Sequence, residues 1–108
     1  MTASRIRDLN DRFRRLGQGN GRLFVTAGVQ ARGPVFVAEA ICAVRSDDSV
    51  DQANDPYGER DFGVVTVKGT RVFWKLDYFD PTLSAGSEDP ADETRTCRVL
   101  TVMLAQEY

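Results

Sequence analysis

The chain has 108 residues, of which 42% are hydrophobic, and a formal net charge of −2 without any histidine. A chain of this length builds one hydrophobic core, so we expect a single domain over residues 1–108. Two cysteines and no histidine argue against a zinc site and against a nucleophile activated by histidine, and we expect no cofactor. The sequence has no long apolar run and no signal-peptide pattern, which predicts a soluble, cytoplasmic protein.

The first predicted element is a helix over Ser4–Leu16. Ser4 is a suitable N-cap, and Gly17 is a suitable stop. The apolar residues recur at spacings of three, four and three and form one stripe: Ile6, Leu9, Phe13 and Leu16. We expect the arginines of this helix to lie on the opposite face, in solvent: Arg7, Arg12, Arg14 and Arg15.

A turn at Gln18–Gly21 leads into the apolar run Leu23–Ala27, which predicts a central strand covered on both faces. Pro34 suits the first position of a second helix, which we expect to be mostly buried. Its wide apolar face consists of Phe36, Val37, Ala40, Ile41, Ala43 and Val44. Cys42 and Cys97 are interpreted as small buried hydrophobic residues rather than as a disulfide.

A polar, acidic segment from Ser46 to Arg60 predicts a long loop, which in a compact domain is typically functional or disordered. Phe62–Phe79 then predicts a hairpin with Gly69-Thr70 as its two-residue turn, so that Val67 faces Val72 and Val65 faces Trp74. One side of this hairpin is apolar: Val65, Val67, Val72, Trp74, Leu76 and Tyr78. The other side is mixed, and is either covered by a helix or offered to a partner: Thr66, Phe73, Lys75, Asp77 and Phe79.

A second loop follows Pro81 and carries Ser87–Asp92. The final apolar run, Arg98–Leu104, favours a strand over a short buried helix because it is rich in β-branched residues. Together these elements predict an α+β fold, in which two helices pack on an antiparallel sheet of about four strands.

Five blocks of the sequence resemble an uncharacterised family of small bacterial proteins of unknown function, also found on plasmids and mobile elements. They are Asn-Asp-Pro-x-Gly-Glu, Asp-Phe-Gly, Trp-Lys-x-Asp-Tyr, Gly-Ser-x-Asp-Pro-Ala-Asp and Arg-Val-Leu-Thr-x-Met-Leu-Ala. Arg7–Asp11 and Leu23–Gly28 fit the family's opening as well. The resemblance implies no activity, cofactor or catalytic residue. Histidine often stands in the family's pattern where this chain has Arg60, which argues against an essential acid–base role at that position.

Charge divides the chain into a basic and an acidic part. Residues 1–45 carry eight arginines and three acidic side chains, a net charge of +5, whereas residues 46–108 carry six basic and thirteen acidic side chains, a net charge of −7. Surfaces of one sign steer encounters with partners of the opposite sign. Both parts therefore favour an interaction, although each also fits a solvated surface.

The mixed sheet face and the acidic loop predict a non-enzymatic protein-interaction module, because aromatic side chains supply contact area and carboxylates orient a partner. The candidate partner-binding residues are Tyr57, Glu59, Asp61, Lys75, Asp77 and Phe79. In its most specific form, the hypothesis is a mobile-element-encoded, anti-CRISPR-like inhibitor of a host defence or nucleic-acid-handling complex that occupies a basic DNA groove.

Two alternatives remain open. The first is a metal-dependent phosphodiester hydrolase, in which acidic residues converge on one end of the sheet and Lys75 stabilises charge: Asp55, Glu59, Asp61, Asp77, Asp80, Glu88, Asp89 and Asp92. Against it, Asp55, Asp80 and Asp89 each precede a proline, as turn-making residues do. The second alternative is a nucleic-acid binder that contacts phosphates through the N-terminal helix and its neighbours: Arg12, Arg14 and Arg15, with Arg5 and Arg22.

Overall fold

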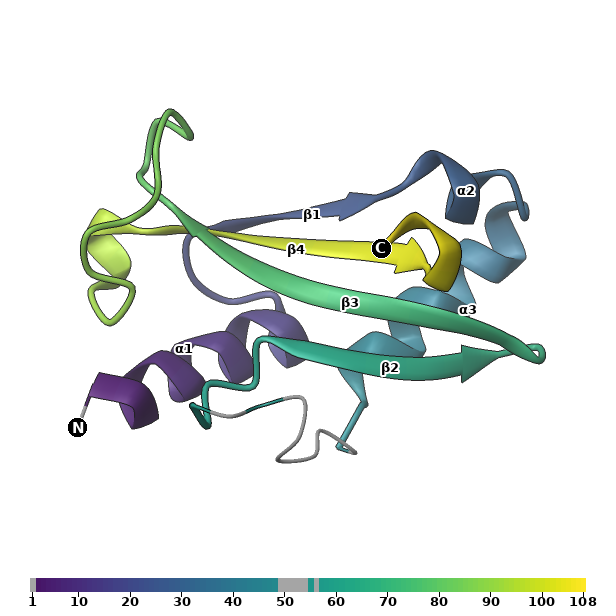
Figure 1. The fold of residues 1–108 in the computed structure, drawn as a ribbon, viewed down its shortest axis with the longest axis horizontal. Coiled ribbons are helices and arrows are strands. Elements are labelled where there is room, and N and C mark those ends of the chain that lie inside the picture. The colour runs from purple at the N-terminus through teal and green to yellow at the C-terminus, as the bar shows by residue number, and fades with distance from the viewer. Residues whose placement is uncertain (1, 49–54, 56) are drawn as a thin grey trace.

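The computed structural model describes residues 2–48, 55 and 57–108, so residues 49–54 and 56 of the predicted acidic loop lie outside it. The elements in chain order are α1 (Thr2–Leu16), β1 (Gly21–Val25), α2 (Ala27–Gln30), α3 (Pro34–Arg45), β2 (Phe62–Val67), β3 (Thr70–Phe79), the 3-10 turn η1 (Glu93–Arg95), β4 (Cys97–Leu104) and the 3-10 turn η2 (Ala105–Glu107) (Figure 1). The predicted α+β architecture is confirmed, and the short helix α2 adds an element that the sequence did not predict.

The four strands form one sheet in the order β1-β4-β3-β2. β3 pairs antiparallel with both β2 and β4, but β1 pairs parallel with β4. The sheet is therefore mixed, and the prediction of a wholly antiparallel sheet is wrong for β1. A parallel neighbour requires a long crossover connection, which here runs from β1 through both following helices and the hairpin before β4 begins.

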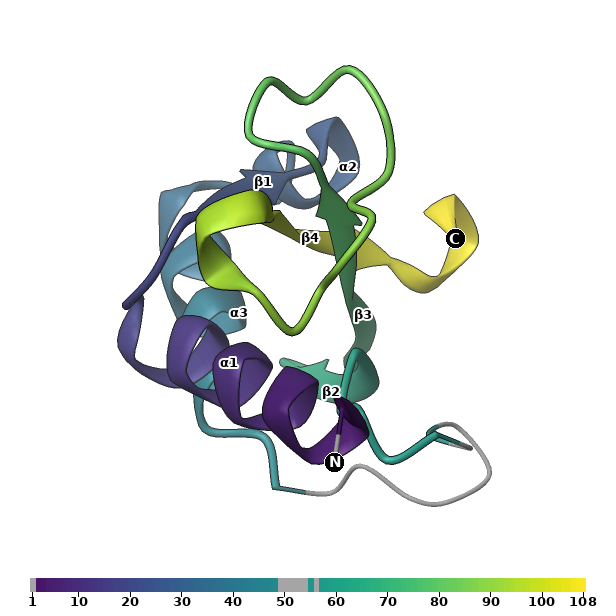
Figure 2. The same ribbon diagram turned by 90° about the vertical axis from the view of Figure 1, so that its left-hand side faces the viewer.

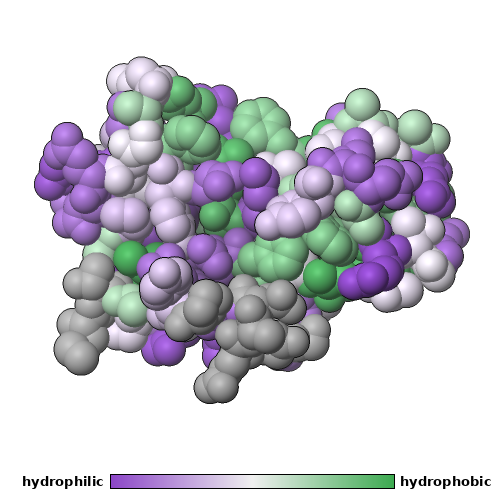
Figure 3. Space-filling model, viewed as in Figure 1, coloured by the Kyte–Doolittle hydropathy of each residue, from purple (hydrophilic) through white to green (hydrophobic). Residues whose placement is uncertain are grey.

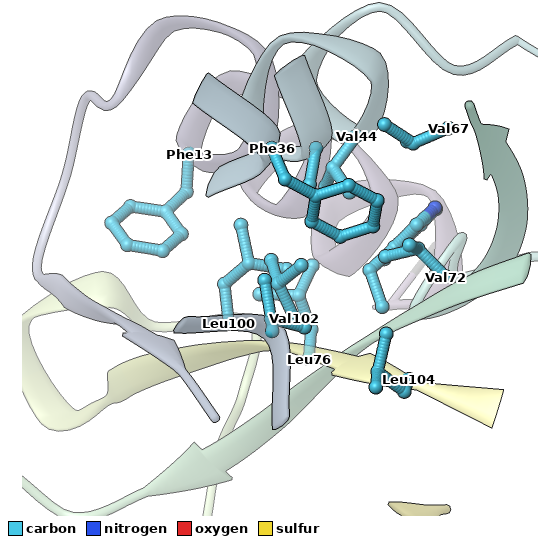
Figure 4. Packing of buried hydrophobic residues seen from close by; sticks show 12 residues of the cluster. Phe13, Phe36, Val44, Val67, Val72, Leu76, Leu100, Val102 and Leu104 are labelled. Atoms are coloured by element: carbon cyan, nitrogen blue, oxygen red, sulfur yellow. The ribbon is translucent and has the colours of Figure 1, made fainter. Parts of the chain in front are cut away.

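Helices α1 and α3 cover one face of the sheet, and the C-terminal turn lies on the other side (Figure 2). Ile6, Leu9 and Phe13 bury the predicted stripe of α1. From α3, Phe36 and Val44 point at the sheet residues of the core (Figure 4). Within the described residues, none of the helices has the length and apolar character to cross a membrane.

β4 is one of the two interior strands, beside β3, and it confirms the prediction of a strand at Arg98–Leu104. Every residue of β4 except Thr101 is buried, as expected for a strand with a neighbour on each side. The prediction that Leu23–Ala27 is a central strand is wrong, because β1 forms an edge of the sheet and Phe24 is 51% exposed. Both segments are apolar, so their composition alone did not indicate which strand lies inside the sheet and which lies at its edge.

The hairpin forms with a register different from the predicted one. Val65 pairs with Val72 and Val67 with Thr70, so the two-residue turn is Lys68-Gly69, at φ values of 49° and 78°. A turn of this kind requires positive φ at both positions, and glycine tolerates it best at the second. The shift amounts to two residues, which keeps every side chain on its predicted face. The apolar side of the hairpin is accordingly buried against the helices, with Trp74 fully inaccessible.

Two side chains predicted to be buried are exposed instead. Leu16, at the last position of α1, is 66% exposed, because the helix ends there and the stripe runs past the edge of the sheet. Cys42 lies on the solvent side of α3, whereas Cys97 is buried in β4. Both cysteines are free thiols, so they are not joined in a disulfide.

Candidate interaction surfaces

The sheet face opposite α1 and α3, here called the open face, carries half of the predicted partner-binding residues. Strand alternation places Lys75, Asp77 and Phe79 on this face, since their neighbours Trp74 and Leu76 are buried under the helices. The ammonium of Lys75 lies 3.2 Å from the Asp77 carboxylate, and both side chains are about two-fifths exposed. The charges of Lys75 and Asp77 are therefore already paired with each other.

An aromatic cluster closes one end of the open face. The ring of Phe73 lies 5.5 Å from that of Phe62 and 5.3 Å from that of Tyr108, measured between centroids. Phe73 is thus packed by side chains from β2 and the C-terminus rather than by a helix. The sequence left open whether a helix covers Phe73, and the structure shows that Phe62 and Tyr108 pack against it instead.

Glu107 fixes the C-terminal turn that carries Tyr108. Its carboxylate accepts hydrogen bonds from the Thr26 hydroxyl at 2.7 Å, the Gly28 amide at 3.0 Å and the Leu104 amide at 2.8 Å. These donors, with the Thr26 hydroxyl as the strongest influence, lower the pKa of Glu107 below its usual value. The turn is thereby tied to the connection between β1 and α2.

A hollow of about 310 Å³ lies on the open face between the strands and the loop after β3. Its lining is mainly apolar: Phe24, Asp77, Phe79, Leu83, Val99 and Thr101. Phe24 projects from the edge strand at one rim and is half exposed. Figure 3, which shows the molecule from this face, displays apolar patches bordered by hydrophilic side chains. An apolar centre with a polar rim is the usual composition of a protein-binding surface.

Leu83 reaches the hollow in an unfavourable backbone conformation, with φ at 61°. A non-glycine residue in this left-handed region costs about 1–2 kcal/mol. Asp80 makes the turn possible, because its carboxylate accepts from the backbone amides of Thr82 and Ser84 and from the Thr82 hydroxyl. These bonds, led by the Thr82 hydroxyl, lower the pKa of Asp80. Local strain of this kind is a reason to look for function at the residue that bears it.

A larger apolar groove of about 760 Å³ lies between β1 and α3. It is lined by Leu23, Phe24, Val25, Gln30, Pro34, Val37, Ala38 and Ile41. None of these eight side chains is charged. Phe24 borders both this groove and the hollow on the open face, so the exposed aromatic ring marks the line where the two surfaces meet.

Glu59 belongs to a buried polar network under α1 and not to the open face. Asn10 is fully buried; its side-chain amide donates to the Glu59 carbonyl at 3.0 Å and to the Tyr78 hydroxyl at 2.8 Å. The Tyr78 hydroxyl donates to the Glu59 carboxylate at 3.0 Å, and Arg98 donates from Nε to Asn10 at 2.7 Å. Burial raises the pKa of Tyr78 above its usual range. This polar network ties the end of the acidic loop to the helix.

The other two predicted residues stand apart from both places. Tyr57 is 79% exposed on the loop, away from the residues that line the hollow. Asp61 precedes β2 and is half buried, and this burial, together with the nearby carboxylate of Glu59, raises its pKa. The structure therefore distributes the six predicted residues over four places: the open face, the polar network, the exposed loop at Tyr57 and the half-buried position of Asp61 before β2.

The prediction that the arginines of α1 lie in solvent is wrong for Arg14. Arg14 is fully buried, donates to the Val44 carbonyl at 2.6 Å and stacks 4.5 Å from the centroid of the Trp74 ring. Burial lowers the pKa of Arg14. Arg15 bonds the backbone carbonyl of Asp47 and the carboxylate of Asp48, and Arg12 is half buried.

A sequence signal for the burial of Arg14 did exist. Asn10 and Arg14 are four residues apart and directly follow Leu9 and Phe13, so they widen the apolar stripe rather than oppose it. Polar residues at these positions are buried when a helix is covered on two flanks, as α1 is by the sheet and α3. Arg60 pairs with Asp11 on α1, with 2.8 Å between the guanidinium and the carboxylate.

The acidic residues do not converge on a metal site in the described part of the chain. Within it, no three carboxylates or thiols are grouped so that they would hold a metal ion. Several of the predicted ligands instead make turns, as their positions before proline indicated: Asp55 accepts from the Arg60 amide, Asp80 from Thr82 and Ser84, and Asp89 from the Ala91 amide. Asp92 likewise accepts from Thr94, and Glu88 pairs with Arg95.

Comparison with known proteins gives a family but no activity. A family model described as a protein of unknown function (DUF3768) matches residues 25–107. The match runs from the end of β1 to η2, so Arg7–Asp11 lies outside it. No curated protein and no solved structure matches the chain.

Proposed function

The chain belongs to the DUF3768 family of proteins of unknown function, and on that premise we propose that it is a non-enzymatic protein-interaction module that docks a folded partner on the open face. The hollow beside Phe24 and Leu83 is the observation that carries this proposal. It combines an exposed aromatic side chain with a leucine in an unfavourable backbone conformation. Stability alone favours neither feature.

The chemistry of the hollow specifies the contact. An apolar side chain of the partner enters between Phe79, Leu83 and Val99, where burial of both surfaces is favourable. Lys75 and Asp77 lie at the rim as a neutral pair, so a partner with one charge of each sign meets them without leaving a charge unpaired. The partner is therefore a protein surface with an apolar centre and mixed charges around it.

The most specific form of the proposal is an inhibitor of a host defence or nucleic-acid-handling complex, encoded on a mobile element and similar in action to an anti-CRISPR protein. Its support is charge: the segment that follows β3 in the chain carries Asp80, Glu88, Asp89, Asp92 and Glu93. An acidic segment of this kind steers a protein toward a basic nucleic-acid groove. If expression of the chain changed neither defence activity nor target binding, the inhibitor hypothesis would be refuted. The broader proposal of a protein-interaction module would still stand.

Capture from native bacterial lysate tests the module, with the purified partner then measured by calorimetry. We expect one discrete partner on the wild-type chain and its loss with Leu83→Asn or Asp77→Lys. Asparagine tolerates the left-handed conformation at position 83, so the first variant removes the apolar wall without unfolding the loop. Asp8→Lys is the matched control, since Asp8 is an exposed carboxylate on α1.

A charge swap separates a partner contact from a local effect on the sheet. Lys75→Asp combined with Asp77→Lys keeps the pair but exchanges its signs. Binding that stays lost in the double variant assigns the charges to the partner, whereas restored binding assigns them to the sheet alone. A purified partner whose affinity is the same for wild type and Leu83→Asn would refute docking on the open face.

A further inference from the structure

The backbone of β1 has an unpaired edge beside the apolar groove. In a parallel pair, alternate residues of a strand direct both backbone groups to the same neighbour. The Asn20 carbonyl accepts from Arg98 and the Thr26 amide donates to Val102, so the even-numbered residues of β1 face β4. Gly21, Leu23 and Val25 consequently direct their backbone groups to the free edge.

The side chain of Gln30 covers the end of this free edge. The Gln30 side-chain amide donates to the Val25 carbonyl at 2.7 Å, which satisfies the last outward acceptor of the strand. Among the described residues, none bonds the outward amide or carbonyl of Gly21 or Leu23, and Leu23 lies in the groove. Natural proteins usually protect such an edge with charge, proline or a covering segment, because it is a template for another strand.

The groove provides the apolar half of a strand-binding site. A strand added beside β1 places every second side chain toward α3, where Leu23, Val37 and Ile41 form the wall. Ala38 is small and exposed on α3, which leaves room for these side chains. Main-chain bonds to the edge and apolar contacts in the groove together form the usual mode of strand addition.

Charge around the groove indicates the remaining side chains of the occupant. Arg22 is exposed on β1 and lies on the same side as Phe24, so it faces the side chains of an added strand that point away from α3. The arginines that flank α3 are engaged elsewhere: Arg32 donates to the Thr70 hydroxyl at 3.2 Å, and Arg45 donates to the Arg14 carbonyl at 2.9 Å. The acidic residue of α3, Glu39, lies 3.7 Å from Lys68 at the β2–β3 turn. Arg22 is therefore the charged side chain that an added strand would meet beside β1.

We propose that the free edge of β1 binds an extended peptide segment of a partner protein by strand addition, with alternate apolar side chains in the α3 groove and an acidic side chain opposite Arg22. This site is separate from the open face and goes beyond the docking proposed there. A second copy of the chain fits less well, because edge-to-edge pairing of two β1 strands would bring together the two cationic Arg22 side chains.

Selection of random peptides displayed on phage, followed by synthesis of the strongest binder with blocked ends, tests the proposal. We expect enrichment of alternating apolar and acidic residues. Ala38→Glu places a carboxylate in the groove and, because glutamate favours helices, should leave α3 intact. We expect this variant to weaken peptide binding at least about tenfold. Val35→Glu is the matched control, because Val35 is exposed on the same helix but does not line the groove.

Backbone methylation and a charge exchange identify the mode of binding. Methylating one alternate set of peptide amides should abolish binding, and methylating the other set should leave it, because only one set faces β1. Replacing the peptide's glutamate by lysine should weaken binding, and Arg22→Glu should restore it. Equal tolerance of both methylated sets would refute strand addition.

Three further outcomes overturn the proposal, and none of them depends on whether the open face docks a folded partner. Failure to enrich any alternating peptide removes the site. A concentration-dependent dimer of the wild-type chain that dissociates with Ala38→Glu assigns the edge to a second copy. Loss of peptide binding in Leu83→Asn, which leaves β1 and α3 unchanged, would place the peptide on the open face instead. Retained peptide binding in that variant, by contrast, keeps the two proposals independent.

Discussion

The polar network around Asn10 and the apolar hollow beside Phe24 differ in composition and in exposure. The network joins Tyr78, Glu59 and Arg98 through paired hydrogen bonds beneath α1. The hollow has few polar contacts and leaves an aromatic ring half in solvent. Polar side chains that resemble catalytic groups thus maintain the fold, whereas the exposed apolar ones are available to a partner.

Asn10→Ala should produce the largest loss of stability. The change leaves the Nε of Arg98 and the Glu59 carbonyl without their partner in a buried setting, which costs about 2–4 kcal/mol of unfolding free energy. Urea denaturation measures it, and Asn20→Ala is the control, because Asn20 is exposed and bonds the carbonyl of Glu93. An equal loss in both variants would show that the network does not act as a unit.

Tyr78→Phe should remove about 1 kcal/mol at neutral pH, since one hydroxyl with two partners is lost. A second effect depends on pH. The folded chain holds the Tyr78 proton above the usual tyrosine pKa of about 10, whereas the unfolded chain releases it there. The stabilisation is therefore present below about pH 10 and lost as pH rises toward the folded pKa.

Denaturation midpoints at about pH 8 and about pH 10.5 check this dependence. We expect a smaller fall with pH in Tyr78→Phe than in the wild type. Tyr57→Phe is the control, because Tyr57 is exposed. A fall that Tyr78→Phe leaves unchanged would assign the loss to other titrating groups.

Leu83→Asn should leave stability within about 0.5 kcal/mol while removing partner binding. Relief of the left-handed conformation offsets the loss of half-buried contacts. Denaturation and calorimetry on the same preparation separate the two effects. A large loss of stability would instead show that Leu83 supports the fold, as the residues of the polar network do, and would contradict its assignment to the docking surface.

Glu107→Gln should have the smallest effect, confined to the C-terminal turn. The folded chain lowers the pKa of Glu107, so the stabilisation it gives is present above the unfolded pKa and lost as pH falls through the folded one. Amide exchange at Gly28 should be faster in the variant, and the wild type should approach it in acid. Unchanged exchange at Gly28 would contradict the role of this carboxylate.

The elements of the fold were accessible from the sequence, but their neighbours were not. Helical spacing in α1, the alternation of the hairpin and the apolar run of β4 each identify one element. The hairpin turn shows the limit: glycine marks its neighbourhood, yet its conformation decides that Lys68 rather than Thr70 shares the turn. Local rules therefore gave the faces correctly and the register incorrectly.

The candidate site was only partly accessible. Lys75, Asp77 and Phe79 follow from alternation along one strand, and they lie together on the open face. Phe24, Leu83 and Val99 complete the hollow from three other segments, and no spacing rule connects them. Glu59 and Asp61 were assigned to the surface by their charge, but the sequence held no sign that α1 would bury the end of their loop.

The sequence by itself determined the two long helices, the hairpin, the strand at Arg98–Leu104 and the turn-making role of its aspartates, because these depend on interactions between residues close in the chain. Only the tertiary structure decided that β1 is an edge, that Arg14 is buried and that Phe24 lies between two apolar surfaces. Each of those outcomes depends on which segments pack against one another. Strand order is set by the whole sheet, and the burial of a side chain is set by the element that covers it.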